Sequence, residues 1–150
     1  MRRIVFILFS ACLLVACGDK KPSGAEALLQ QANSQFEQGQ YDRALISIDS
    51  LRKVYPQAIE ARKQALKLYQ DIELKRSQEE LAQVDSLLQT VTSDYNSQLA
   101  KVEEDKRQLR ATSEELTQLT KTRVRRDSLQ TRYDVLCAKI RYIHKKQKES

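Results

Sequence analysis

Residues 74–119 decide the predicted fold, and they read LKRSQEELAQVDSLLQTVTSDYNSQLAKVEEDKRQLRATSEELTQL. Mainly apolar side chains recur in this stretch at intervals of seven, as Leu74, Leu81, Leu88, Tyr95, Val102, Leu109 and Leu116, the a positions of a heptad. The d positions follow three residues later at Ser77, Val84, Val91, Gln98, Asp105, Thr112 and Leu119. A sustained heptad is typical of a coiled coil. We therefore predict an all-α chain with a coiled coil over residues 73–146.

A second apolar stripe follows with a change of register. Its members are Leu129, Tyr133, Leu136, Ile140 and Ile143. The shift corresponds to a stammer if the helix is continuous, or to a bend within residues 120–128. No Gly or Pro follows Pro56. We therefore expect one long helix over residues 57–146, which would be ~135 Å long at ~1.5 Å per residue.

Polar residues occupy three consecutive d positions, at Gln98, Asp105 and Thr112. A polar core residue can specify the register of a coiled coil, at a cost in stability. The alternative is a middle section that is loosely packed or partly exposed, because an unpaired carboxylate is strongly penalised in an apolar interface.

The charges beside the heptad favour antiparallel packing. In a parallel homodimer Glu80 would face Asp85 of the second copy, and Lys101 would face Lys106. Folding about a point near residue 93 would instead pair Glu80 with Lys106 and Asp85 with Lys101. Residues 92–97 at that point are weak helix formers. An intrachain hairpin and an antiparallel dimer therefore stand beside the single long helix as alternatives.

Residues 25–72 predict a small helical unit that precedes the coiled coil. A first helix is expected over residues 25–38 and a second over residues 41–55, with a break at Gly39-Gln40 and an end at Pro56. Apolar side chains recur in them every three or four residues, at Leu28, Leu29, Ala32 and Phe36, and then at Ala44, Leu45, Ile48, Leu51 and Val54. The helix that begins after Pro56 is expected to cover this helical hairpin.

The spacing Gly39-x-Tyr41-x-x-Ala44, followed by Ile48 and Pro56, resembles one tetratricopeptide repeat over about residues 25–58. The first helix departs from the repeat at Leu28, Gln31 and Gln35, where Trp, Leu and Tyr are usual, and it has Ala32 where Gly is usual. The resemblance implies two close-packed helices of a protein-interaction module. A plain helical hairpin with the same spacing is the alternative, and a groove for a peptide has little support in either case.

The first residues have the pattern of an export signal. Arg2 and Arg3 precede an apolar stretch over residues 4–15, which is too short to span a bilayer. Leu14-Val15-Ala16-Cys17 resembles the lipobox of bacterial lipoproteins, and the resemblance implies cleavage before Cys17 and acylation of that residue. We therefore predict a signal peptide over residues 1–16, a polar tether over residues 17–24, and a protein held to a cell-envelope membrane. The outer membrane facing the periplasm is the expected location, with the inner membrane as the alternative.

The C-terminal part of the chain is basic. Residues 121–150 carry a net charge of +7, whereas residues 17–120 carry −3. The candidate anion-binding residues are Arg132, Lys139, Arg141, Lys145, Lys146 and Lys148. Anionic lipid and an acidic envelope polymer are the expected ligands, and an export signal argues against nucleic acid. The alternative is a solvated helix face with a frayed end at Lys145-Lys146-Gln147-Lys148, and residues 147–150 are expected to form a tail beyond the coiled coil.

No motif of catalysis or of metal binding is found in the sequence. His144 is the only histidine, and Cys137 has no second cysteine to pair with once Cys17 is lipidated. We therefore expect no enzyme activity, no metal and no cofactor. The predicted function is a non-catalytic adaptor or spacer that binds another envelope protein, and homo-oligomerisation remains open.

Overall fold

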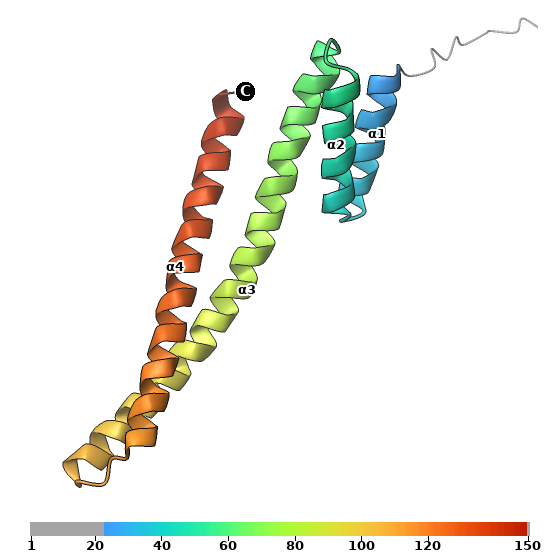
Figure 1. Cartoon of the computed structure of the whole chain (residues 1–150). Coiled ribbons are helices and arrows are strands. Elements are labelled where there is room, and N and C mark those ends of the chain that lie inside the picture. Colours follow the sequence, from blue (N-terminus) through green and yellow to red (C-terminus); the bar gives the residue numbers. More distant parts are fainter. Residues whose placement is uncertain (1–22, 150) are drawn as a thin grey trace, which may run out of the picture.

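The computed structural model describes residues 23–149, which form four helices (Figure 1). They are α1 (Gly24–Glu37), α2 (Tyr41–Val54), α3 (Ile59–Arg107) and α4 (Ser113–Glu149). Residues 23–149 contain no strand, so the all-α prediction of a short helical hairpin followed by a long helix is confirmed. The predicted signal peptide, Cys17 and all of the tether up to Pro22 lie outside the described residues.

Helices α1 and α2 and the first part of α3 form a three-helix head. Ala32, Ala44 and Ala65 are fully buried, and their small side chains allow the three helices to approach closely. The rest of the core is Ala25, Leu29, Ile48, Leu51, Ala61, Leu68 and Ile72. The two expected helices and their cover by the helix after Pro56 are therefore present.

Both ends of α1 are fixed by local hydrogen bonds. Ser23 and Glu26 form a capping box, in which each side chain accepts a hydrogen bond from the other residue's backbone N–H. At the C-terminus Gly39 has φ +72°, and the Gly39 and Gln40 N–H groups donate to Phe36 and Gln35 carbonyls. This is a Schellman motif, for which glycine is the preferred residue at the left-handed position.

The head is attached to the middle of α3 by polar contacts from the start of α2. The Tyr41 hydroxyl donates to Glu79 at 2.8 Å, and Arg76 pairs with Asp42 at 3.1 Å. The hydrogen bond to the Glu79 carboxylate raises the pKa of Tyr41. These contacts fix the direction of the head along α3.

Helix α4 folds back along α3 to form an antiparallel hairpin (Figure 1). The buried side chains of the seam are Ser77, Val84, Val91 and Val102 on α3, and Thr122, Leu136 and Ile143 on α4. Away from the turn, two ion pairs bridge the helices, between Arg132 and Glu80 at 2.5 Å and between Lys139 and Glu73 at 2.7 Å. The d positions on α3 up to Val91 are therefore in the seam, as the heptad predicts.

The expectation of one long helix over residues 57–146 is wrong. The chain turns at residues 108–112, and both residues 92–97 and residues 120–128 are helical. Glu80 consequently pairs with Arg132 rather than with Lys106. At 49 residues, α3 is ~73 Å long, about half the length expected for the continuous helix.

Leu109 makes the turn possible by adopting a left-handed backbone conformation, with φ +56°. Its N–H donates to the Lys106 carbonyl, and the Arg110 N–H donates to the Asp105 carbonyl at 2.7 Å. This is the same Schellman pattern as at Gly39, with leucine in the glycine position. The Leu109 side chain is 95% exposed, so its assignment to the seam is also wrong.

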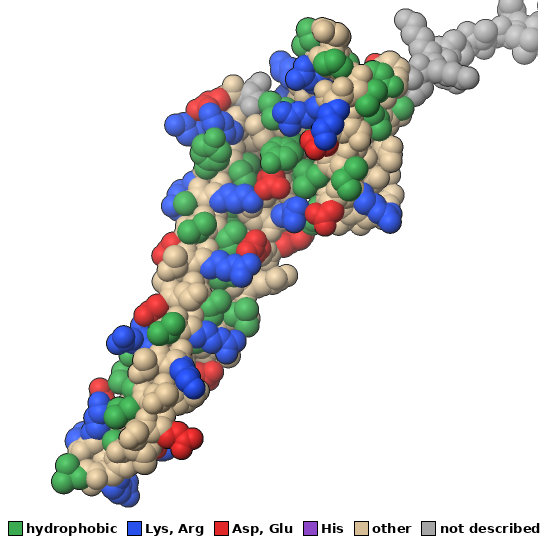
Figure 2. Space-filling model, in the orientation of Figure 1, with side chains coloured by type: hydrophobic (Ala, Val, Ile, Leu, Met, Phe, Trp, Pro, Cys, Tyr) green, Lys and Arg blue, Asp and Glu red, His purple; other side chains and the backbone are tan. Residues whose placement is uncertain are grey.

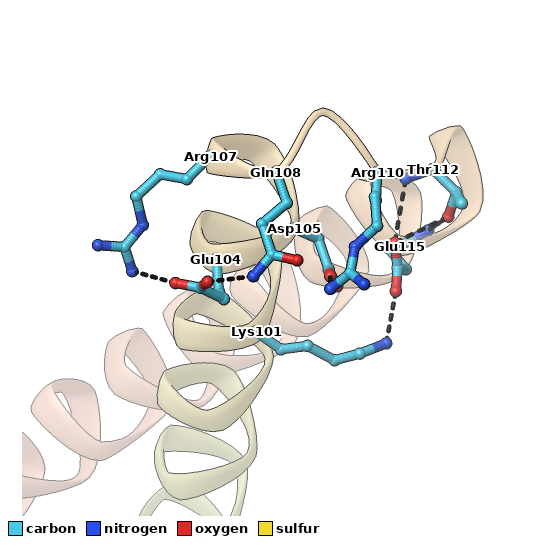
Figure 3. A network of polar contacts seen from close by, with 8 residues as sticks. All are labelled: Lys101, Glu104, Asp105, Arg107, Gln108, Arg110, Thr112 and Glu115. Carbon is cyan, nitrogen blue, oxygen red and sulfur yellow. Dashed lines mark hydrogen bonds and ion pairs between the residues drawn. The ribbon is translucent and has the colours of Figure 1, made fainter.

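A network of polar side chains surrounds the turn (Figure 3). Thr112 and Glu115 form a capping box at the start of α4, with backbone-to-side-chain distances of 3.0 and 3.2 Å. Lys101 of α3 also pairs with Glu115, not with Asp85, and these contacts lower the pKa of Glu115 to about 2. Arg110 pairs with Asp105 at 3.2 Å.

The turn accounts for two of the three polar d positions. Asp105 and Thr112 serve the two helix ends rather than a coiled-coil core. Gln98 is half-buried in the seam, and its Oε1 atom has no hydrogen-bond partner among residues 23–149.

Candidate binding surfaces

Two of the six predicted anion-binding residues are engaged by α3. Arg132 binds Glu80 through both Nε and Nη2, at 2.9 and 2.5 Å. Lys139 binds Glu73 at 2.7 Å, and the Glu73 side chain is only 20% exposed. Each of these two cations is therefore held beside an acid of α3, which leaves it less available to an external anion.

The other four residues lie on the last turns of α4. Lys146 contacts Glu149 at 2.8 Å and lies 5.8 Å from the centre of the Tyr142 ring, while Lys145 is 4.0 Å from Glu149. Glu149 raises the pKa of Lys146, first through their hydrogen bond. Arg141 and Lys148 form no ion pair within residues 23–149. The cationic cluster at the end of α4 therefore contains four of the six residues that the sequence predicts.

A cleft of about 330 Å³ lies between α3 and this end of α4. Leu66 and Tyr69 of α3 face Tyr142 and Ile143 of α4, and lysine and glutamate side chains form its edge. Leu66 is 46% exposed and Tyr142 is 59% exposed. The sequence does not predict this cleft, because the helix that begins after Pro56 is expected only to cover the helical hairpin.

A second cationic surface was not predicted either. The α2–α3 corner, which we define as residues 52–67, carries Arg52, Lys53, Arg62, Lys63 and Lys67 against a single acid, Glu60. All six of these side chains are exposed. The signal was present in the sequence, but the five cations are divided between two helices and do not form a continuous run.

No arrangement that suggests catalysis is found in the described part of the chain. Residues 23–149 contain no group of three or more His, Cys, Asp or Glu side chains that could hold a metal ion. His144 contacts Gln147 at 3.3 Å. Cys137 is free and half-buried, and its thiol raises the pKa of the adjacent Tyr133.

Within residues 23–149, no helix has the length and apolar character needed to cross a membrane. Comparison with known proteins gives no match to a family model, to a curated protein or to a solved structure. The function is therefore inferred from the sequence motifs and the geometry alone.

Proposed function

We propose that this chain is a non-catalytic envelope lipoprotein that is anchored through Cys17 and acts as a spacer or adaptor. Support for the anchor comes from Leu14-Val15-Ala16-Cys17, which closes a short apolar segment preceded by Arg2 and Arg3. Multiple acyl chains on such a cysteine give stable membrane attachment.

The observation that carries the spacer role is the position of the two ends of the rod. Ser23 lies at the head, and the turn at residues 108–112 lies at the opposite end (Figure 1). The six residues 17–22 reach ~20 Å at most when fully extended. A chain held at Cys17 therefore keeps its head near the membrane, and the rod allows the turn to reach up to ~70 Å beyond it.

The anchor is tested by Cys17→Ala, with Cys137→Ala as the matched control. We expect the first variant to lose signal processing or to leave the membrane fraction, and the second to behave as the parent. Normal cleavage and unchanged membrane retention of Cys17→Ala would contradict the lipoprotein assignment.

The adaptor role is tested at the exposed Leu109 side chain. A photocrosslinking residue placed there in intact cells should capture one envelope protein that is identified by mass spectrometry. The same residue at Val124, which is 60% exposed on the side of the rod, serves as the control. Equal products from both positions would show that contacts at the turn have no selectivity.

A second candidate function is a peripheral module that binds anionic lipid or an acidic polymer through the end of α4. The exposed and unpaired Arg141 and Lys148 support it. The double variant Arg141→Gln/Lys148→Gln should then lose salt-sensitive binding, whereas Arg123→Gln/Arg125→Gln on the exposed shaft of α4 should retain it.

A further inference from the structure

The α2–α3 corner combines exposed apolar and cationic side chains. Val54 is 62% exposed and Ile59 is 71% exposed, although both are large aliphatic residues. Arg52 and Lys53 precede Val54 directly, and Arg62 and Lys63 follow Ile59 by one helical turn. Aliphatic side chains bordered by Lys and Arg are typical of surfaces that lie in the headgroup region of a membrane.

Most of the positive charge at this corner is not offset by acids. Lys53 is 3.6 Å from Asp49, and both side chains are more than 60% exposed, so water screens the pair. Arg62 donates to the Pro56 carbonyl at 2.7 Å, which leaves its charge in place. Arg52, Lys63 and Lys67 have no ion pair within residues 23–149. Residues 52–67 thus present a net charge of +4.

The corner lies at the end of the molecule where α1 begins. Ser23 and Glu26 line one depression together with Ala58, Ile59 and Gln64. The cationic end of α4 is at the same end of the rod, since Gln147 donates to Asp71 at 2.8 Å. Figure 2 shows Lys and Arg side chains around apolar ones on the visible face of this end.

We propose that the α2–α3 corner contacts the anionic headgroups of the leaflet that holds the lipid of Cys17. Val54 and Ile59 enter the interfacial layer, and Arg52, Lys53, Arg62 and Lys63 bind lipid phosphates around them. This inference rests on the proposed lipid anchor, because a lipid on Cys17 is at most ~20 Å of chain from Ser23. The contact holds the head against the bilayer, so that the α3–α4 hairpin points away from it.

A single tryptophan reports whether the corner enters a membrane. The chain has no Trp, so Ile59→Trp places the only one at the corner, and Val135→Trp places the only one on an exposed site of α4. Both variants are made in the chain from Gly18 onward, which keeps every described residue and lacks the anchor. With vesicles of phosphatidylglycerol and phosphatidylcholine in equal parts, the emission of the Ile59→Trp protein should shift to the blue and be quenched by brominated lipid. Unchanged emission of this variant when bound, or an equal shift in both variants, would overturn the proposal.

Charge variants test the ionic part of the contact. Each Lys or Arg near an anionic surface strengthens binding about fivefold, so Arg52→Gln/Lys63→Gln should weaken vesicle partitioning more than about 20-fold. Arg123→Gln/Arg125→Gln removes the same charge from the shaft and should have little effect. Equal weakening by both pairs would show that net charge, not the corner, determines binding. Circular dichroism verifies that all variants remain folded.

The outcome is independent of the anchor, because these proteins lack Cys17. Failure to bind vesicles overturns the corner proposal and leaves the Cys17 assignment to be decided by fractionation. Normal cleavage of the Cys17→Ala chain together with salt-resistant retention in the membrane fraction would conversely refute the lipid anchor without affecting the vesicle result.

Discussion

At the scale of single residues, Leu109 carries an energetic cost that its side chain does not offset. A left-handed conformation costs a non-glycine residue about 1 kcal/mol, and the Leu109 side chain is 95% exposed. Leu109→Gly should therefore raise the free energy of unfolding by about 1 kcal/mol in urea denaturation.

The matched control is Gly39→Ala, in the equivalent position of the other Schellman motif. A Cβ atom at Gly39 would have no neighbour within 4 Å, so the change acts through the backbone at φ +72° and should destabilise the protein. A Leu109→Gly protein that is less stable than the parent would show that the leucine side chain has a contact partner.

Glu115 makes the turn sensitive to acid. Its hydrogen bond to Lys101, and then its hydrogen bonds with Thr112, lower the pKa of this carboxyl from 4.5 to about 2. A lowered pKa contributes stability that is complete above pH ~4.5 and is lost as the pH falls through about 2. Glu115→Gln should therefore flatten the fall in melting temperature between these two pH values.

Glu114 is the control for this measurement, since its side chain is exposed and forms no ion pair within residues 23–149. The Glu114→Gln protein should lose stability with acid as steeply as the parent does. Parallel curves for the parent and Glu115→Gln would contradict a role of the Glu115 carboxylate in stability.

At the scale of elements, the α3–α4 seam depends on a narrow line of apolar side chains. Leu136 is 5% exposed, whereas its neighbour Val135 is 61% exposed. Leu136→Ala should lower the free energy of unfolding by about 2–4 kcal/mol, because it removes buried methyl groups and leaves a cavity. Val135→Ala should change it by less than about 0.5 kcal/mol. Equal melting temperatures for the two variants would indicate that α4 does not pack stably on α3.

The heptad predicts which residues of α3 face a partner helix, because period and burial depend on the same helical geometry. It does not identify the partner, and the turn lacks the glycine that usually marks such a position. Thr112-x-x-Glu115 is the available signal, since this spacing is typical of a helix start. Residues 92–97 are weak helix formers but stay helical in the packed hairpin, where Arg126 lies 4.2 Å from the Tyr95 ring.

The two cationic surfaces also differ in how far the sequence predicts them, because one lies within a single segment and the other depends on packing. The cluster at the end of α4 is continuous in the sequence and was predicted from composition, but the pairing of Lys139 with Glu73 depends on how two distant segments meet. The α2–α3 corner was not predicted, because its cations lie on both sides of Pro56 and become one surface only when α2 packs against α3.

At the scale of the whole molecule, the turn at residues 108–112 determines whether α4 packs on α3 of the same chain or on α3 of a second chain. A continuous helix through these residues would remove α4 from its own α3 and allow it to pack on the α3 of a second copy. The contacts of an antiparallel domain-swapped dimer would be those of the hairpin. The equilibrium between the monomeric hairpin and the swapped dimer therefore depends on the local hydrogen bonds of the turn rather than on the seam.

The triple variant Leu109→Ala/Arg110→Ala/Thr112→Ala, which makes residues 109–112 all alanine, should convert the monomer expected for the parent into a dimer. The change removes the capping hydroxyl of Thr112 and replaces the left-handed leucine by a strong helix former, so that a continuous helix of ~135 Å becomes favourable. Light scattering should report twice the parent mass, and small-angle scattering should report nearly twice its length. Alanine at Gln89, Thr90 and Ser93, which are exposed within α3, is the control and should leave the mass unchanged. A monomeric alanine variant of parental length would show that the seam, and not the turn, directs the chain to fold back on itself.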